Sequence, residues 1–150
     1  MIIWLTGQPG SGKTTIAREI ITSGPHCQWF HVDGDDIRDL FDNKDYSEQG
    51  RRKNIELAQQ LSQYLSSKGK KVVVSLVSPY RDQREKFKEK MGDKVIEVYV
   101  HTMEKRGREG FFVKNYEPPL ENFINCDTTN VPVSLCSELI LEYEKNSRRG

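Results

Sequence analysis

Residues 4–15 read WLTGQPGSGKTT, a glycine-rich loop that follows directly on an apolar run. Within this stretch, Gly7–Thr14 match the pattern G-x-x-x-x-G-K-[ST] at every fixed position. The apolar run Ile2–Leu5 predicts a strand covered on both faces, and apolar residues recur at helical spacing after the loop until Gly24-Pro25. Such a loop between a strand and a helix is typical of a site for nucleotide phosphates.

The residue types of this loop each have an expected part in holding phosphate. Glycines let backbone N–H groups turn inward around phosphate oxygens, where the start of the helix adds the positive end of its dipole. We expect Lys13 to reach the outer phosphates and the Thr14 hydroxyl to bind Mg²⁺. The alternative is a turn that merely joins strand to helix. The residues expected to bind ATP here are Gly7, Gly10, Ser11, Gly12, Lys13, Thr14 and Thr15.

Strand and helix patterns alternate along the rest of the chain. Apolar runs predict strands over 28–32, 71–77, 94–100 and 122–126, of which 71–77 is the most apolar. Helices are predicted from an N-cap at Ser47 to Gly69, over 80–90, and over 133–145, the last with Leu135, Leu139, Ile140 and Tyr143 on one side. This alternation predicts an α/β fold, a parallel β-sheet flanked by helices of the P-loop NTPase and nucleotide-kinase type. We expect a single domain over 1–150, with an irregular lid region at about 102–120.

Composition limits the classes of partner. The chain has 150 residues, 35% of them hydrophobic and 30% charged, and a formal net charge of only +1. No global field draws such a protein to nucleic acid or to a membrane, and no run resembles a membrane span or a signal peptide, so we expect a cytoplasmic protein. We expect Cys27, Cys126 and Cys136 to be reduced and buried. The histidines, which are His26, His31 and His101, are too scattered to predict a metal site.

Other motifs decide between the classes of protein that carry such a loop. A GTP switch needs D-x-x-G, which is absent, and N-K-x-D, which Asn43-Lys44-Asp45 does not complete. A motor ATPase usually ends its central strand in an acidic residue, whereas the most apolar strand here ends in Val77-Ser78. These absences favour a small kinase.

An acidic cluster follows the second predicted strand, at Asp33-Gly34-Asp35-Asp36-Ile37-Arg38. The carboxyl ends of parallel strands meet at one edge of a sheet, so these carboxylates should emerge beside the phosphate loop. Phosphoryl transfer needs one carboxylate to orient and deprotonate the attacking hydroxyl, for which we expect Asp33, and another near Mg²⁺, for which we expect Asp35. The alternative is an Asx-type turn that caps a helix, which accounts for only one of the aspartates.

Five motifs occur in the order in which one kinase family has them. They are the phosphate loop, Asp33-Gly34-Asp35 with Arg38, Arg51 with Asn54-Ile55, Ser78-Pro79-Tyr80-Arg81 with Arg84, and Tyr116-Glu117-Pro118-Pro119. Together they resemble adenylylsulfate kinase, and the resemblance runs from Ile2 to about Thr128. It implies transfer of the γ-phosphoryl group of ATP, with Mg²⁺, to the 3′-hydroxyl of adenylylsulfate, which gives 3′-phosphoadenylylsulfate.

The resemblance also implies roles for individual residues. Asp33 would act on the hydroxyl, with Lys13 and Asp35 as the other catalytic residues and Thr14 and Asp35 as metal ligands. A dianionic acceptor suits planar cationic forks, and its base suits an aromatic face. The residues expected to bind the acceptor are Arg38, Arg51, Asn54, Ser78, Pro79, Tyr80, Arg81 and Phe111, of which Phe111 would stack on the adenine.

The chain departs from the family's pattern at three places. Asp36 stands where the family usually has Asn, and Gly50 where an acidic residue usually precedes the arginine. The family's lid is shortened to His101–Gly110, where Lys105, Arg106 and Arg108 either supply the lid's positive charge, with Arg106 at the nucleotide, or belong to a solvated loop. Two other functions stay open, namely a kinase for another small hydroxyl acceptor and a nucleotide-binding module without phosphotransfer. The sequence also leaves open whether the chain forms a homodimer.

Overall fold

A computed structural model describes residues 1–23 and 28–149 of the chain. The predictions made for His26, Cys27 and the helix stop at Gly24-Pro25 therefore lie outside the described residues. The elements in chain order are β1 Ile2–Thr6, α1 Lys13–Thr22, β2 Trp29–Asp33, α2 Gly34–Leu40, α3 Glu48–Ser67, β3 Lys71–Ser75, α4 Arg81–Met91, β4 Val95–His101, β5 Phe123–Asp127 and α5 Val133–Arg149. Short 3₁₀ turns occupy Gly92–Lys94 and Glu109–Phe111.

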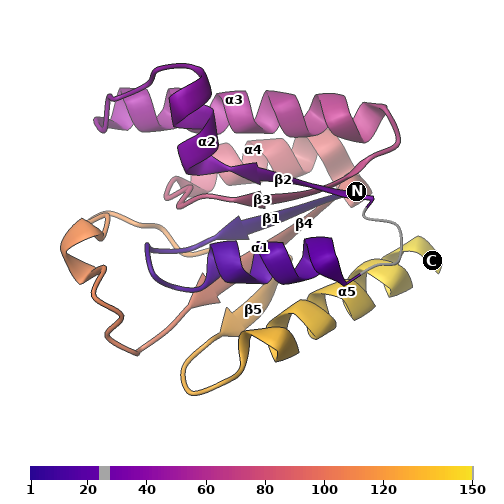
Figure 1. Ribbon diagram of the computed structural model, residues 1–150. Coiled ribbons are helices and arrows are strands. Elements are labelled where there is room, and N and C mark those ends of the chain that lie inside the picture. Colours follow the sequence, from indigo (N-terminus) through magenta and orange to yellow (C-terminus); the bar gives the residue numbers. More distant parts are fainter. Residues whose placement is uncertain (24–27, 150) are drawn as a thin grey trace.

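The strands form one parallel sheet in the order β2-β3-β1-β4-β5 (Figure 1). Strand β1 lies in the middle and all its residues are buried, as its unbroken apolar sequence predicts. Trp4 is level with Val74 on one neighbouring strand and with Glu97 on the other. The predicted fold class, a parallel β-sheet flanked by helices, is confirmed.

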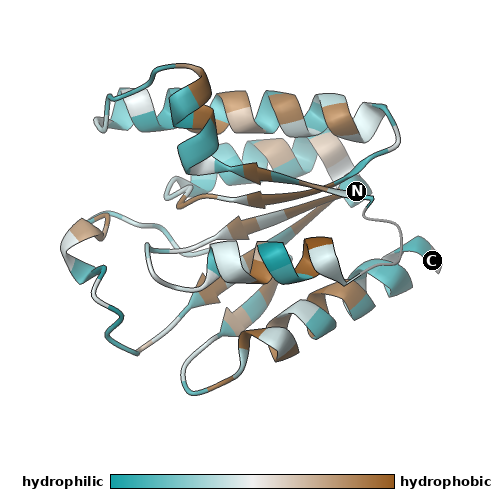
Figure 2. Cartoon of the chain, viewed as in Figure 1, coloured by the Kyte–Doolittle hydropathy of each residue, from teal (hydrophilic) through white to brown (hydrophobic). Residues whose placement is uncertain are grey.

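Helices cover both faces of the sheet and create two separate cores (Figures 1 and 2). Alternate residues of β1 point to opposite faces, so Ile3 and Leu5 join the core under α1 and α5, while Ile2 and Trp4 join the core under α2, α3 and α4. The long 102–122 segment leaves the carboxyl end of β4 and lies at the same end of the sheet as the phosphate loop. In the described part of the chain, no helix is both long and apolar enough to cross a membrane.

Strand β3 ends two residues earlier than predicted, at Ser75 rather than Val77. Beyond it, the Val77 carbonyl accepts from the Gly7 N–H at 3.3 Å. The Thr6 hydroxyl lies 2.8 Å from the same carbonyl oxygen and 3.1 Å from that of Ser78, so a side chain supplements the backbone bonds here. Ser78 then adopts a left-handed backbone with φ of 48°, which costs energy for a residue other than glycine. The chain turns here toward α4.

The prediction of which side of the last helix is apolar was wrong. In α5, Ile140 is buried, but Leu135, Leu139 and Tyr143 are each about half exposed. The buried side instead carries small residues such as Cys136 and Ser137, and the Ser137 hydroxyl donates to Glu19 Oε2 of α1 at 2.7 Å. Small side chains let α5 pack closely on α1, and this packing overrides the periodicity of the larger apolar residues.

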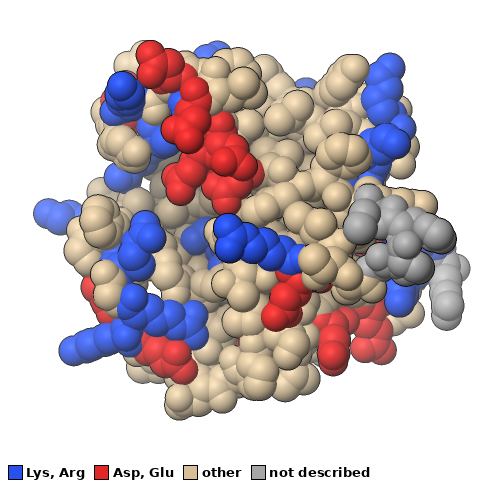
Figure 3. Space-filling model, viewed as in Figure 1, with Lys and Arg blue, Asp and Glu red and all other residues tan. Residues whose placement is uncertain are grey.

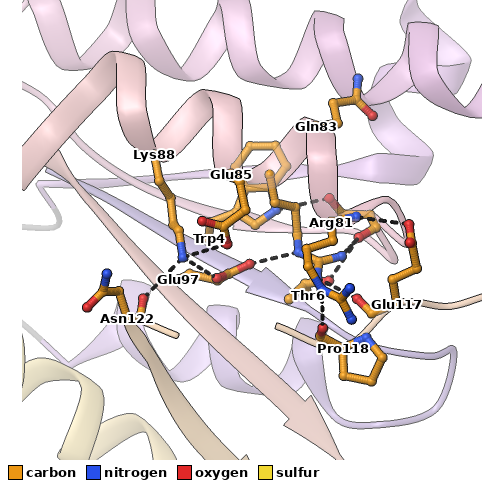
Figure 4. A network of polar contacts seen from close by, with 12 residues as sticks. Trp4, Thr6, Arg81, Gln83, Glu85, Lys88, Glu97, Glu117, Pro118 and Asn122 are labelled. Carbon is orange, nitrogen blue, oxygen red and sulfur yellow. Dashed lines mark hydrogen bonds and ion pairs between the residues drawn. The ribbon is translucent and has the colours of Figure 1, made fainter. Parts of the chain in front are cut away.

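A buried ion network fastens the end of the 102–122 segment to the sheet (Figure 4). Arg84 Nε donates to Glu97 Oε2 at 2.7 Å, and the side chains of both residues are only 1% exposed. Lys88 Nζ binds Glu97 Oε1 at 2.8 Å and the carbonyl of Glu121 at 3.1 Å, while Arg84 also donates to the carbonyls of Ser78 and Glu117. A charged cluster inside the apolar core thus fixes two chain segments that border the site.

Candidate active site

The phosphate loop occupies the turn between β1 and α1. Gly7 is required for a close approach, since a Cβ atom there would lie 2.1 Å from the carbonyl oxygen of Val100. Gly12, at the N-cap of α1, has a left-handed φ of 112° that favours glycine. Because glycine has no side chain to cap the helix, the first N–H groups of α1 remain available to an anion.

Lys13 is the most strongly perturbed base in the loop. Its Nζ donates to the carbonyl oxygens of Gly7 at 2.8 Å and Gln8 at 2.9 Å, and the residue is 8% exposed. Burial lowers the pKa of Lys13 to about 7, although the charges of Asp33 and Asp35 oppose this shift. The free loop therefore holds this amine near its point of half-protonation at neutral pH.

Binding of Mg·ATP should consequently take up protons. Phosphate charges favour the ammonium form, so we expect the pKa of Lys13 to rise from about 7 in the free protein toward the ordinary lysine value in the complex. An amine with a pKa of about 7 is roughly half deprotonated at pH 7 and about nine-tenths deprotonated at pH 8. We expect the proton uptake attributable to Lys13 to rise accordingly, from about 0.5 to about 0.9 per site. Calorimetry in buffers of different ionisation enthalpy measures it.

The Lys13→Arg variant is the control for this experiment. Arginine stays protonated at all these pH values, so the side chain at position 13 of the variant takes up no proton when the nucleotide binds. The variant then shows only the proton exchange of the nucleotide itself. Equal proton uptake by the two proteins at pH 8 would contradict the lowered pKa of Lys13.

Asp33 lies at the carboxyl end of β2, where the sequence places it, and it is the N-cap of α2. Its Oδ1 accepts a hydrogen bond from the N–H of Asp35 at 2.8 Å, which is the Asx-type cap considered from the sequence. Its Oδ2 accepts from Thr14 Oγ1 at 3.5 Å and from Ser75 Oγ at 3.2 Å. One carboxylate thus caps the helix and also faces the phosphate loop, so the cap is compatible with a catalytic role for Asp33, which stays a prediction.

The oxygen donors at this point suit a small divalent cation. Mg²⁺ prefers oxygen ligands and usually takes only one or two from the protein, the rest being phosphates and waters. The Thr14 hydroxyl and the neighbouring carboxylates are donors of this kind. Among the described residues, no group of three or more His, Cys, Asp and Glu could enclose a metal ion by itself. Asp35 is exposed, and the contact from this cluster to Thr14 comes from Asp33.

Arg38, predicted to bind the acceptor, is anchored in the loop that follows α2. Its Nη1 donates to the carbonyls of Asn43 at 3.0 Å and Asp45 at 3.1 Å, and the guanidinium lies 4.0 Å from the centre of the Tyr46 ring. Gly50 allows this loop, because a Cβ at that position would lie 2.2 Å from the Asp45 carbonyl oxygen and 2.4 Å from its carboxyl carbon. Asp45 therefore occupies the space of the side chain that Gly50 lacks.

Arg51 and Asn54 lie on α3, one turn apart, near the start of α2. Asn54 is buried, and its Nδ2 donates to the carbonyl of Gly34 at 3.2 Å. Its Oδ1 is buried without a hydrogen-bond partner, which is costly unless a ligand supplies a donor. Arg51 is half-buried. The Asn54 contact holds α3 against the start of α2, beside the acidic cluster, and the part of Arg51 and Asn54 in binding the acceptor stays a prediction.

The predicted acceptor residues at 78–81 are mostly enclosed by protein. Ser78 Oγ accepts from the indole N–H of Trp4 at 3.2 Å, and Tyr80 is buried with the Arg52 guanidinium 4.2 Å from its ring centre. Pro79 accepts from the Glu117 N–H at 2.9 Å. Arg81 Nε donates to the carbonyl of Pro118 at 2.8 Å. In the structure these residues contact other parts of the protein at the edge of the site. Their contact with an acceptor stays a prediction.

The 102–122 segment lies against the phosphate loop. Arg106 donates to the carbonyls of Gly10 at 3.1 Å, Ser11 at 3.0 Å and Thr128 at 2.9 Å, and it pairs with Glu104 at 2.9 Å. The solvated-loop alternative is therefore wrong for Arg106, which supports the loop through its carbonyl side. The other lid residues are more open, with Lys105 and Arg108 exposed.

Phe111 presents an aromatic face beside the phosphate loop. Its side chain is 68% exposed, and the Arg108 guanidinium lies 5.2 Å from its ring centre. A Cβ at Gly10 would lie 3.1 Å from the Cβ of Arg108, so Arg108 borders the loop and Phe111 lies beside Arg108. Figure 3 shows basic side chains around the 102–122 segment and acidic ones gathered over α2. An anionic ligand with a flat base would meet cations and an aromatic ring on the lid side.

Comparison with known proteins identifies the family. The family model described as Adenylylsulphate kinase matches residues 1–137. The chain belongs to the adenylylsulfate kinase family. An adenylyl-sulfate kinase of Pseudomonas aeruginosa is 35% identical over 135 residues, which cover 85% of this chain and 69% of the relative. One of Staphylococcus haemolyticus is 30% identical over 168 residues, covering 97% and 84%.

A solved structure agrees in fold with this family member. The adenylylsulfate kinase of Mycobacterium tuberculosis, solved in complex with AMPPNP and APS, superposes with a TM-score of 0.81 at 19% identity, covering 96% of both chains. The predicted resemblance to the adenylylsulfate kinase family is confirmed, and so is the prediction of an ATP-dependent phosphotransferase.

Sequence reasoning missed several residues at the site of this family member. Gln8 clamps the lid segment, since its Nε2 donates to the carbonyl of Val113 at 2.8 Å and its Oε1 accepts from the Val113 N–H at 2.9 Å. The Thr128 hydroxyl donates to the carbonyl of Ser11 at 2.7 Å. Thr128 follows the fifth predicted strand at the carboxyl edge of the sheet, so strand position alone could have found it. Gln8 carried no sequence signal.

Proposed function

We propose that this protein transfers the γ-phosphoryl group of Mg·ATP to the 3′-hydroxyl of adenylylsulfate, with Asp33 as the base. One observation carries the assignment of the base: Asp33 Oδ2 lies 3.5 Å from the Thr14 hydroxyl of the phosphate loop. A carboxylate at this point is close to where the loop holds the outer phosphates, so it can meet both the attacking hydroxyl and the reacting phosphate.

The phosphate side of the reaction is supplied by the loop. N–H groups of Gly10–Thr15 and the start of α1 hold phosphate oxygens, and Lys13 supplies a positive charge. Bound Mg²⁺ would neutralise charge that develops on the transferred phosphoryl group and on the departing diphosphate. Thr14 is the protein residue best placed to hold it, with Asp35 nearby on α2.

The acceptor side is supplied by β2, α2 and α3. Asp33 accepts the proton of the 3′-hydroxyl as the acceptor oxygen bonds to the γ-phosphorus, while the bond from that phosphorus to the β–γ bridging oxygen breaks and ADP leaves. Arg38, Arg51 and Asn54 would hold the sulfate-phosphate end, and Phe111 would stack on the adenine. The unpartnered Oδ1 of Asn54 only accepts hydrogen bonds, so it supports a ligand hydroxyl or N–H at this place. An oxygen of the sulfate-phosphate group would instead need the Asn54 Nδ2 donor, which also bonds to the Gly34 carbonyl.

Steady-state kinetics of two Arg51 variants test this acceptor site. Arg51→Ala should raise the KM for adenylylsulfate by about 10- to 100-fold and leave the KM for ATP within about twofold, because a charge-assisted contact contributes roughly 1.5–3 kcal/mol. Arg51→Lys should recover little, because a point charge cannot reproduce the planar fork.

The neighbouring Lys53→Ala is the matched control for Arg51. Lys53 lies on the same helix, is exposed and pairs with the exposed Glu56 at 3.6 Å, so its removal should change neither KM. If Arg51→Ala raised the KM for ATP and the KM for adenylylsulfate equally, the acceptor site would have to lie away from α3. Absence of any phosphorylated adenylylsulfate from the wild-type protein would overturn the proposed reaction.

A further inference from the structure

Two side chains behind Asp33 form a hydrogen-bonded chain that the proposed function does not use. His31 and Asp33 are alternate residues of β2, and Ser75 is level with Asp33 on β3. His31 Nε2 lies 2.6 Å from Ser75 Oγ, and Ser75 Oγ lies 3.2 Å from Asp33 Oδ2. The side chains of His31 and Asp33 are 17% and 18% exposed, so the chain is largely shielded from water.

The direction of the hydrogen bonds in this chain follows from the chemistry of its members. An ionised carboxylate only accepts, so the single Ser75 hydroxyl proton must point to Asp33 Oδ2. The Ser75 oxygen then accepts from His31, which must carry its proton on Nε2. Burial lowers the pKa of His31 and so favours the neutral ring, which makes this donation in the tautomer with its proton on Nε2. The order is His31 Nε2–H to Ser75 Oγ–H to Asp33 Oδ2.

The hydrogen bonds from His31 to Ser75 and from Ser75 to Asp33 hold the second oxygen of the Asp33 carboxylate. Oδ1 is held by the N–H of Asp35 at the head of α2, and Oδ2 is held by Ser75 from the adjacent strand. The Ser75 hydroxyl could rotate to other acceptors if His31 did not occupy its acceptor side. Misplacement of a reacting group by about 1 Å can cost a factor of about 10² in rate, so such fixing has a kinetic consequence.

We propose that His31 is a positioning residue for the transfer reaction, which acts through the Ser75 hydroxyl to hold the Asp33 carboxylate toward Thr14. The inference rests on the proposed role of Asp33 as the base. Among the described residues, the polar contacts of the His31 ring go to Ser75 and, at 3.8 Å, to Asp33, so its loss should alter turnover and leave ligand binding intact.

Variants of His31 and Ser75 test the inference by a kcat-against-KM comparison. His31→Phe should lower kcat by about 10- to 100-fold, with the KM values for ATP and adenylylsulfate within about twofold of wild type. His31→Gln keeps an N–H donor near the same place and should recover most of this loss. Ser75→Ala should lower kcat like His31→Phe, and the double variant should be little worse than either single one, because both break the same chain.

A matched control and a spectroscopic readout separate positioning from general damage. Phe30→Leu changes the exposed neighbour of His31 on β2, which points to the opposite face of the sheet, and should leave kcat unchanged. The ¹⁵N spectrum of histidine-labelled protein should show His31 neutral with its proton on Nε2, and ATP binding by calorimetry should show that the variants are folded.

The outcomes distinguish this inference from the proposed function. If the wild type is active and His31→Phe keeps the wild-type kcat, the inference is overturned and the proposed function is not. The same holds if His31→Phe and His31→Gln lose kcat equally. Additive losses in the double variant, or a proton on Nδ1 of His31, also overturn it. A wild type that does not phosphorylate adenylylsulfate overturns the proposed function, and the inference falls with it.

Discussion

Asp33→Asn should lower kcat for phosphoryl transfer by about 10² to 10⁴ and leave ATP binding close to wild type, since this is the typical loss when a positioned base is removed. Asparagine caps helices as well as aspartate does, so the bond from the Asp35 N–H that starts α2 should survive. The loss should therefore come from the reaction and not from the fold. Single-turnover kinetics and calorimetric ATP binding measure the two effects separately.

Asp36→Asn is the matched control for this prediction. Asp36 is exposed, lies on the same helix, and stands where the adenylylsulfate kinase family usually has asparagine. We expect its kcat to stay within about twofold of wild type. If Asp33→Asn kept near-normal turnover while Asp35→Asn lost it, the base would have to be reassigned to Asp35.

Breaking the buried Arg84–Glu97 pair should have the largest effect on stability. Glu97→Leu leaves the Arg84 guanidinium unpaired at a site where both side chains are 1% exposed, and removal of one partner of such a pair typically costs about 3–5 kcal/mol. Arg84→Met should cost a similar amount, because it also removes the donors to the carbonyls of Ser78 and Glu117. Urea denaturation measures the free energy of unfolding of each variant.

The double variant and an exposed pair provide the controls for stability. Replacing both Arg84 and Glu97 removes the unpaired Arg84 charge and leaves Lys88 its pair with Glu85 at 2.9 Å, so the loss should fall well below the sum of the two single losses. Glu56→Ala breaks an exposed pair with Lys53 and should cost less than about 1 kcal/mol. Additive losses for Arg84 and Glu97 would show that the two side chains act independently.

The fold and the positions of the phosphate loop and Asp33 could be predicted because they depend on the pattern of neighbouring residues in the sequence. The unbroken apolar runs and the glycine-rich loop identify the parallel sheet and the position of Lys13 and Thr14, and strand ends place Asp33 at the same edge. The N-cap at Ser47 was also predicted correctly, and its side chain accepts from the Gly50 N–H at 3.3 Å.

The rest depends on contacts between segments that are distant in sequence. Nothing in the order of residues says that Gln8 binds Val113, that His31 meets Ser75, or that Cys136 and Ser137 let α5 approach α1. The end of β3 was predicted too late because Val77 is apolar, although its carbonyl is bound by the Thr6 hydroxyl and the Gly7 N–H outside the regular strand. Tertiary contacts overrode the local pattern at each of these points.

Mass analysis of the product is the most direct measurement of the central claim. The wild-type protein is incubated with ATP, Mg²⁺ and a mixture of adenylylsulfate, other nucleotides, nucleosides and small hydroxylated anions at equal concentration. We expect 3′-phosphoadenylylsulfate as the main phosphorylated product, in an amount equal to the ADP released. Phosphorylation of a different hydroxyl compound, with adenylylsulfate unchanged, would contradict the account.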